Sequence, residues 1–120
     1  MKTILVVEDN EKNLYLMRYI LEKNHYIVWE ARNAQEVLEM ISKDEKPEAI
    51  LMDIQLPDIN GFELTRRIRE SDWDGTIPIV ALTSYAMTGD REKALDAGCT
   101  GYIEKPIDPE TIIHEIEQYL

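Results

Sequence analysis

The chain has little of what marks secreted, membrane-spanning or nucleic-acid-binding proteins. Its 120 residues include one cysteine, Cys99, so no internal disulfide can form, which fits a reducing cytosol. No apolar run exceeds four residues, which excludes a membrane-spanning helix, and the amino terminus lacks the pattern of a secretory signal. Lysine and arginine number 13 against 24 aspartates and glutamates, and the net charge of −11 repels nucleic acid and anionic membrane surfaces.

The residues that are present indicate one globular α/β domain. Hydrophobic residues make up 44% of the chain and charged residues 31%, a balance typical of a folded domain. A length of 120 residues fits a single domain, which we expect to span residues 1–120. Strand-like and helix-like segments alternate five times along it. Since parallel strands need crossover connections, this alternation predicts a (βα)5 doubly wound fold with a parallel five-stranded sheet.

Short apolar runs mark the strands, and capping residues mark the starts of the helices. The runs at residues 4–7, 26–29, 49–52, 79–82 and 102–103 predict the strands. Asn10 is expected to cap a helix that runs to about Lys23, and Asn33 with Glu36 resembles a capping box. The remaining start signals are Asn60-Gly61, Thr88 and Asp108-Pro109, and Gly98 is expected to end the fourth helix.

Polar side chains follow four of these runs at the point where each predicted strand ends. Glu8 and Asp9 follow the first run, Asp53 the third and Thr83 the fourth, and Lys105 lies just past the fifth. In a parallel sheet the carboxyl ends of the strands share one edge, and ligands bind in the crevice outside it. The sequence therefore predicts one pocket that holds three carboxylates, a hydroxyl and an ammonium.

This combination of groups suits a divalent cation and a phosphoryl group. Glu8, Asp9 and Asp53 brought together repel one another and raise at least one pKa, and a hard cation such as Mg²⁺ removes that cost. Lys105 can pair with Asp53 or with an incoming phosphoryl oxygen, and Thr83 supplies a hydroxyl donor. With charge neutralised from several sides, the Asp53 carboxylate can attack phosphorus in line and become an aspartyl phosphate.

Four segments carry a family resemblance, in order and with the family's spacing. They are Val7-Glu8-Asp9-Asn10, residues 51–61 (LMDIQLPDING), Ala81-Leu82-Thr83-Ser84 and Glu104-Lys105-Pro106. Thr83 lies 30 residues and Lys105 52 residues past Asp53. The pattern resembles a response-regulator receiver domain over essentially the whole chain. The tract at 83–90 further resembles small single-domain receivers of the cell-cycle regulator type and receivers attached to hybrid kinases.

For the pocket, the resemblance implies a role at each matching position. Asp53 is the implied phosphoacceptor, and Lys105 the implied phosphoryl-binding group. Glu8 and Asp9 are implied to hold Mg²⁺, Asp9 more directly, with Asp53 itself and the backbone carbonyl of Gln55 as further ligands.

The resemblance also implies a conformational switch. Thr83 is implied to move toward the phosphoryl group, while Tyr102 occupies the aromatic switch position and turns inward. A cis peptide bond between Lys105 and Pro106 is implied to aim the lysine into the pocket, since X-Pro bonds are those in which the cis form costs little. Tyr85 is implied to flank the phosphoryl site.

Fold and partners follow from the same resemblance. The implied fold is flavodoxin-like, with strand order 2-1-3-4-5. The implied phosphodonor is a phosphohistidine on a sensor histidine kinase or a histidine phosphotransfer protein, and the output is a changed surface that binds a downstream protein. The chain is expected to catalyse only its own phosphorylation and dephosphorylation. We expect a cytoplasmic monomer that contacts neither nucleic acid nor membrane directly.

Three other interpretations compete with this one. A small Mg²⁺-dependent phosphohydrolase of the haloacid-dehalogenase type also uses an aspartate at a strand end, but its pattern has a second aspartate where this chain has Gln55. A flavin- or nucleotide-binding domain needs a glycine- or hydroxyl-rich phosphate loop where this chain has residues 8–11 (EDNE). A receiver-like module that no longer takes phosphate usually lacks a pocket residue. Asp58 is interpreted as a solvated loop charge.

Overall fold

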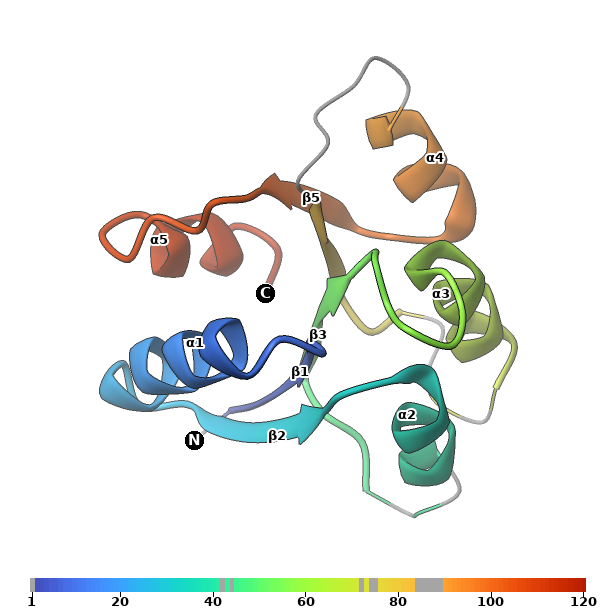
Figure 1. Cartoon of the computed structure of the whole chain (residues 1–120), viewed down its shortest axis with the longest axis horizontal. Helices are drawn as coiled ribbons and strands as arrows, with labels where there is room; N and C mark the ends of the chain where they lie inside the picture. The colour runs from blue at the N-terminus through green and yellow to red at the C-terminus, as the bar shows by residue number, and fades with distance from the viewer. Residues whose placement is uncertain (1, 42, 44, 72, 74–75, 84–89) are drawn as a thin grey trace.

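The computed structural model describes residues 2–41, 43, 45–71, 73, 76–83 and 90–120, except for the side chain of Asp90. Strands and helices alternate along the described chain (Figure 1). The strands are β1 (Thr3–Val7), β2 (Ile27–Ala31), β3 (Ala49–Asp53), β4 (Ile79–Thr83) and β5 (Gly101–Glu104). The helices are α1 (Glu11–Lys23), α2 (Ala34–Ile41), α3 (Gly61–Glu70), α4 (Asp90–Ala97) and α5 (Ile112–Glu117). None of these described helices has the length and apolar character needed to cross a bilayer.

The strands of the described chain form one parallel five-stranded sheet. Their order is β2-β1-β3-β4-β5, which confirms the predicted (βα)5 doubly wound fold and its strand order. In the register, Val7 lies beside Met52, Asp53 beside Leu82, and Thr83 beside Glu104. The strands thus end at nearly the same level, and the carboxyl ends of β1, β3, β4 and β5 lie at one edge.

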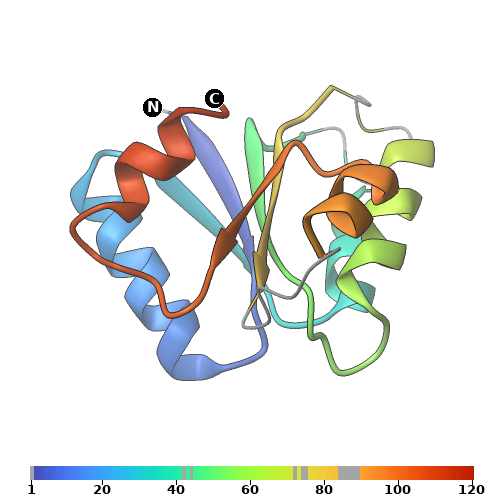
Figure 2. The same ribbon diagram turned by 90° about the horizontal axis from the view of Figure 1, so that it is seen from above.

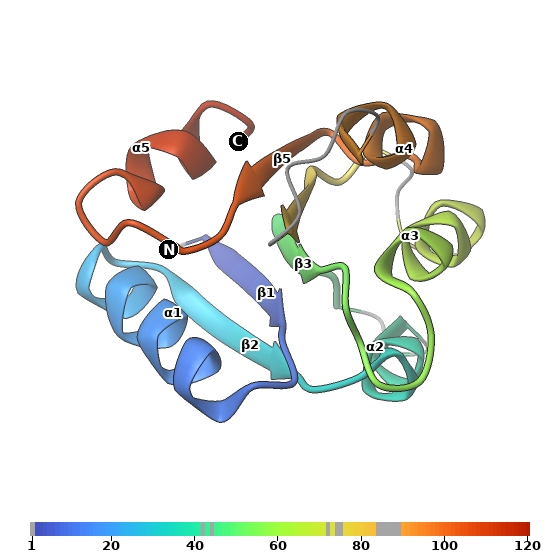
Figure 3. The same ribbon diagram turned by 45° about the horizontal axis from the view of Figure 1, so that its top comes forward.

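Helices cover both faces of the sheet. Helices α1 and α5 lie on one face, and α2, α3 and α4 on the other, with α3 between its two neighbours (Figures 2 and 3). Because successive residues of a strand point to opposite faces, Ile4 and Leu51 pack under α1 and α5, whereas Leu5 and Ile50 pack under the other layer. Strands β1, β3 and β4 are almost wholly buried, so they form a rigid base for the loops at the edge.

Several helix ends lie where the sequence predicts them. The Asn10 side chain accepts hydrogen bonds from two backbone amides of the first turn of α1, a cap worth about 1 kcal/mol of helix stability. Asn60 caps α3 through its side chain, and α4 ends before Gly98, whose φ of 110° suits glycine. The predicted cap of α4, Thr88, lies outside the described residues, as does Tyr85.

Two elements begin later than predicted. Strand β2 starts after Tyr26 and runs to residue 31, because the Tyr26 amide still donates to the Leu21 carbonyl at the end of α1 (3.0 Å). The last helix, α5, begins at Ile112, later than the predicted start at Asp108-Pro109. Asp108 still acts as a capping residue: Oδ1 accepts from the Glu110 amide at 2.9 Å, and the carbonyl accepts from the amides of residues 111 and 112 at 3.1 and 2.9 Å. Residues 109–111 form a turn that leads into the helix.

The capping box predicted for α2 forms only in half. The Asn33 side chain accepts from the Glu36 amide at 2.9 Å, as a capping residue should. The Glu36 carboxylate, however, accepts from the Arg32 amide at 2.8 Å, one residue earlier than a capping box requires. The amides of Ala34 and Gln35 donate to the carboxylate of Asp58, in the loop between β3 and α3.

The chain after β3 returns close to its own backbone at the start of α3. The Gly61 amide donates to the Ile54 carbonyl at 2.9 Å. A Cβ on residue 61 would lie 2.7 Å from the Asp53 carbonyl oxygen and 2.7 Å from Ile54 Cα, and both are backbone atoms that cannot turn away. Glycine at this position therefore lets α3 start where it does and sets where the 54–60 loop ends.

Gly61→Ala is expected to destabilise the domain by about 1–3 kcal/mol, the cost typical of forcing an extra group into a packed site. The sign of the change in the free energy of unfolding is informative, because alanine within a helix is otherwise about 1 kcal/mol more favourable than glycine. Urea unfolding of both proteins measures the difference. Equal or greater stability of the variant would contradict the close contact at residue 61.

Candidate functional site

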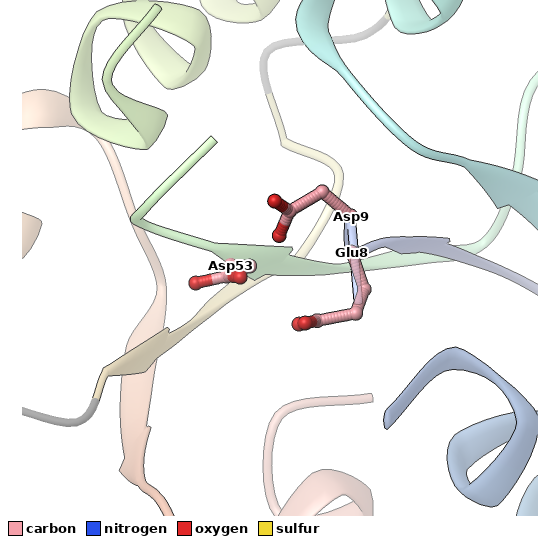
Figure 4. A group of neighbouring side chains, drawn as sticks. All are labelled: Glu8, Asp9 and Asp53. Carbon is pink, nitrogen blue, oxygen red and sulfur yellow. The ribbon is translucent and has the colours of Figure 1, made fainter. Parts of the chain in front are cut away.

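Three carboxylates come together where β1 and β3 end. Glu8 and Asp9 follow β1 directly, and Asp53 is the last residue of β3, the neighbouring strand. One carboxylate oxygen from each lies within 4.8 Å of the others, and the carboxyl groups surround a common space (Figure 4). Glu8 and Asp53 are buried, with 2% and 5% of their surfaces exposed, whereas Asp9 is exposed. The cluster therefore has one solvent-accessible side and two carboxylates set into the protein.

The ammonium of Lys105 lies between the two buried carboxylates. Its Nζ is 3.1 Å from Glu8 Oε2 and 3.3 Å from Asp53 Oδ2. The Lys105 backbone amide donates to the Thr83 carbonyl at 2.7 Å, which fixes the residue against the end of β4. The peptide bond from Lys105 to Pro106 is cis. The sequence predicts the pairing of Lys105 with Asp53 but not its contact with Glu8.

Glu8 is held through both of its carboxylate oxygens. Oε1 accepts from the Asn10 backbone amide at 3.3 Å and from Asn13 Nδ2 at 3.2 Å, while Oε2 faces Lys105. Burial and the adjacent Asp53 carboxylate raise the pKa of Glu8, and Lys105 opposes that rise. The sequence prediction missed Asn13. Its position three residues after the cap of α1, in the turn next to the pocket, is the signal that could have found it.

The Asp53 carboxylate is oriented from two sides. Oδ1 accepts from the Gln55 backbone amide at 3.0 Å, and Oδ2 faces Lys105. The segment after β3 thus bends around the end of the Asp53 side chain, while the Gln55 side chain is exposed. This bend brings the backbone of residue 55 next to the carboxylate cluster.

Thr83 and Tyr102 lie on the same face of the sheet. Thr83 ends β4 and is buried, with 7% of its surface exposed. It pairs with Glu104 of β5, and Ala81 pairs with Tyr102, so by strand alternation these side chains share the face covered by α3 and α4. Tyr102 is half-buried and packs against the apolar cluster under those helices. The predicted switch residues are therefore neighbours on adjacent strands, and the predicted contacts at 84–87 lie outside the described residues.

This arrangement can hold a hard cation and a phosphoryl group side by side. Three carboxylates face one ammonium, so negative charge is in excess until a cation binds. Within the described residues the cluster consists of carboxylates alone, and oxygen donors of this kind favour Mg²⁺ over zinc or copper. The exposed side of the cluster is the side from which an ion and a phosphodonor can enter.

Comparison with known sequences agrees with the geometry. The family model described as the response regulator receiver domain matches residues 4–117. The chain is 40% identical over 119 residues to the polar-differentiation response regulator DivK of Brucella anthropi, an alignment that covers 99% of this chain and 96% of the relative.

Solved structures give the same result for the fold. The receiver domain of sensor histidine kinase PA1611 from Pseudomonas aeruginosa, determined with a magnesium ion in its active site cleft, matches with a TM-score of 0.87 and 32% identity. That match covers 98% of this chain and 96% of the other. The chemotaxis response regulator CheY4 of Vibrio cholerae matches with a TM-score of 0.93 and 25% identity, over 100% of this chain and 99% of the other.

Mg²⁺ is expected to raise the melting temperature of the domain, because an ion that binds only the folded state shifts unfolding by mass action, by about 2.7 kcal/mol at 100 times the Kd. Asp9→Ala should lose most of this response. Without metal the variant should be more stable than the parent, since one repulsive carboxylate is gone. Thermal unfolding across an MgCl₂ series tests both statements.

The matched control for this experiment is Asp96→Ala, which removes an exposed aspartate of α4 outside the cluster. This variant should keep the parent's response to Mg²⁺. Identical responses of the parent and Asp9→Ala would refute the role of Asp9 in metal binding.

Proposed function

The chain belongs to the response-regulator receiver family of two-component signalling, and we propose that Asp53 is the residue that accepts the phosphoryl group. The observation that carries this assignment is the position of its carboxylate. Asp53 ends the central strand β3, with one oxygen 3.3 Å from the Lys105 ammonium and the carboxylates of Glu8 and Asp9 alongside. A nucleophile, a cation site and a positive charge thus converge at one point.

In the proposed reaction, an Asp53 oxygen attacks the phosphorus of a phosphohistidine in line. The P–O bond to Asp53 forms as the P–N bond to the donor imidazole breaks, and the imidazole nitrogen keeps that electron pair. Lys105 can turn from Asp53 Oδ2 to a phosphoryl oxygen, and the Thr83 hydroxyl donates to another. The nucleophile has no proton to lose, so a carboxylate at this position needs no histidine base.

Glu8, Asp9, Asp53 and the backbone carbonyl of Gln55 are the proposed Mg²⁺ ligands. Asp9 is expected to bind directly because it is exposed, whereas the Glu8 oxygens already have protein donors. When bound, the ion neutralises charge on the phosphoryl oxygens and on the cluster. The magnesium ion in the cleft of the PA1611 receiver domain supports this assignment.

The proposed donor is a sensor histidine kinase or a histidine phosphotransfer protein that approaches along α1. A groove opens beside the site on this side, lined by Asn13, Leu16, Lys105, Pro106 and Ile107. On α1 itself, Tyr15 and Tyr19 are largely exposed. Apolar side chains next to the Lys105 ammonium fit a protein that carries a phosphorylated side chain to Asp53.

The proposed output is a changed protein-binding surface, with no product released. A pocket between α4, β5 and the segment after α5 is lined by residues that include Arg91, Leu95, Tyr102 and Tyr119, and Leu95 is 48% exposed. We propose that a downstream protein binds there and that the domain catalyses only its own phosphorylation and dephosphorylation. Residues 1–120 are proposed to act as one monomeric receiver domain in the cytoplasm. The similarity to DivK, a polar-differentiation response regulator, over 99% of this chain supports a role as a response regulator.

A phosphohydrolase of the haloacid-dehalogenase type is not supported. The family model and the relatives belong to receivers. In addition, position 55 carries a glutamine, whose amide cannot act as the carboxylic acid that protonates a leaving group.

Asp53→Asn is expected to abolish phosphoryl uptake while the fold persists, because the amide keeps the shape of the side chain but lacks the nucleophilic carboxylate. Parent and variant are incubated with acetyl phosphate and Mg²⁺ and followed by intact mass. Asp96→Asn, which changes an exposed aspartate on α4, should incorporate phosphate like the parent. Full incorporation by Asp53→Asn would overturn the assignment.

Thr83→Ala is expected to accept phosphate but to lose the response of the output surface. The charge-assisted hydrogen bond from the Thr83 hydroxyl to the phosphoryl group is worth about 1.5–3 kcal/mol, enough to bias two conformations that differ by a few kcal/mol. Tyr102, on the same face, then fills the vacated space. The measurement is the change in amide chemical shifts of residues 90–104 on addition of beryllofluoride, with Thr83→Ser as the control that keeps the hydroxyl. Shifts in Thr83→Ala as large as in the parent would exclude this coupling route.

A further inference from the structure

Asp58 ties the loop after β3 to the start of α2. The residue is exposed, yet Oδ1 accepts from the Ala34 amide at 3.0 Å and Oδ2 from the Gln35 amide at 3.0 Å. Oδ1 also accepts from the Ile59 amide of its own loop at 3.0 Å. Asp58 is thus an exposed loop charge, as interpreted from the sequence, but the sequence did not indicate its bonds to backbone amides. We refer to the bonds from the Asp58 carboxylate to the amides of Ala34 and Gln35 as the α2 clasp.

The α2 clasp supplies what the helix itself cannot. First-turn amides have no acceptor within their own helix, and in the described part of the chain the Asn33 side chain accepts from the amide of Glu36. A carboxylate at this end also interacts favourably with the helix dipole. Hydrogen bonds to the carboxylate, the one from Ala34 foremost, lower the pKa of Asp58, so the charged form of the clasp is favoured.

The loop held by the clasp is the loop that borders the metal site. At its start, the Gln55 amide donates to Asp53 Oδ1, and at its end Gly61 fits closely against the backbone at residues 53–54. Leu56 and Ile59 pack against the apolar cluster under α2, α3 and α4. Figures 1 and 3 show this loop passing beside the start of α2 on its way to α3. The clasp thus anchors the loop between its two fixed ends.

A second link joins the segment before α2 to the start of α1. Arg32 Nε lies 2.6 Å from Glu11 Oε1, but these side chains are 47% and 72% exposed. Ion pairs so open to solvent contribute little to stability. The α2 clasp differs from this ion pair because its two donors are backbone amides of fixed position, so a single side chain joins the loop to the helix.

We propose that Asp58 is a positioning residue for the metal site. It holds the 54–60 loop against α2, so that the backbone carbonyl of Gln55 stays directed at the ion. This role rests on the Mg²⁺ site proposed above. Because binding couplings are reciprocal, Mg²⁺ must also strengthen the clasp: an ion that fixes Gln55 restricts the loop and keeps Asp58 on the amides of Ala34 and Gln35.

The chain offers a matched pair of variants for the test. Asp58→Ala and Asn33→Ala each remove acceptors from the first turn of α2, but only Asp58 connects that turn to the loop. Calorimetric titration with MgCl₂ measures the Kd of each full-length variant. Asp58→Ala should raise it by about tenfold, at the low end of losses seen when an outer-shell partner of a metal ligand is removed. Asn33→Ala should lower the melting temperature but leave the Kd unchanged.

Two further readouts separate positioning from general stability. In the parent, Mg²⁺ should slow hydrogen exchange at the amides of Ala34 and Gln35, and this slowing should vanish in Asp58→Ala. Asp58→Asn, which keeps one acceptor oxygen, should give a Kd between those of the parent and Asp58→Ala. In acetyl phosphate assays, Asp58→Ala should incorporate less phosphate than the parent at limiting Mg²⁺, and saturating Mg²⁺ should restore its incorporation to the parent's level.

The outcomes distinguish this inference from the proposed function. If Asp58→Ala binds Mg²⁺ as tightly as the parent, or if Asn33→Ala weakens binding equally, the positioning role is wrong and the metal site stands. If the parent itself does not bind Mg²⁺, the proposed metal site fails, and the role of Asp58 fails with it.

Discussion

The Lys105 ammonium between Glu8 and Asp53 is the interaction on which the site depends. At the separations in the cluster, two carboxylates repel by about 4 kcal/mol at an effective dielectric constant of about 20, which is comparable with the total stability of a small domain. Lys105 lies 3.1 Å from Glu8 and 3.3 Å from Asp53 and offsets part of this repulsion. Asp9 adds a third carboxylate to the cluster, whereas the ion pairs of the described residues bring the single ammonium of Lys105 to Glu8 and Asp53. The folded domain without metal is therefore electrostatically unbalanced, and a divalent cation bound at the cluster would restore the balance.

The sheet makes this imbalance tolerable. Strands β1, β3 and β4 are covered by packed side chains on both faces. Repulsion among the carboxylates at their carboxyl ends therefore cannot easily push these strand ends apart. Among the described residues, the segments after β1, β3 and β5 surround the cluster. One is fixed around the Asp53 carboxylate by the Gln55 amide, and the Lys105 amide is fixed to the end of β4. A change of charge at Asp53 would thus act first on the neighbouring strand ends, which include Thr83.

Much of the fold and of the site could be predicted because the determining signals are local. Each strand is a short apolar run, and parallel strands place the residues that follow them at one edge, which brings Glu8, Asp53 and Lys105 together. Caps such as Asn10 act within their own turn and can be read from a few residues. The element boundaries that differ from the prediction are set by hydrogen bonds at the ends of helices. The Tyr26 amide remains bonded to the end of α1, and the Asp108 carbonyl accepts from residue 111 as well as from Ile112, so a turn precedes α5.

Partners that are distant in the sequence were beyond local signals. Asp58 is 24 residues from Ala34, and nothing in the intervening sequence specifies that the loop after β3 passes the start of α2. Asn13 is closer to Glu8, but its contact depends on how α1 leaves the sheet edge. Both residues orient groups that the sequence does identify. Local patterns in this chain therefore indicate which residues carry the chemistry, and the paths of the loops determine how those residues are held.

Coupling between the site and the output surface has to operate in both directions. If a phosphoryl group on Asp53 favours the arrangement in which Thr83 and Tyr102 have moved, then a protein that prefers that arrangement must favour the phosphoryl-bound geometry by the same free energy. Thr83 and Tyr102 share one face of the sheet and lie on adjacent strands with no helix between them, so a movement of one side chain can act directly on the other. A partner at α4 and β5 would thus not only detect the modified Asp53. By holding Tyr102 inward, it would also keep the Thr83 hydroxyl on the phosphoryl oxygens.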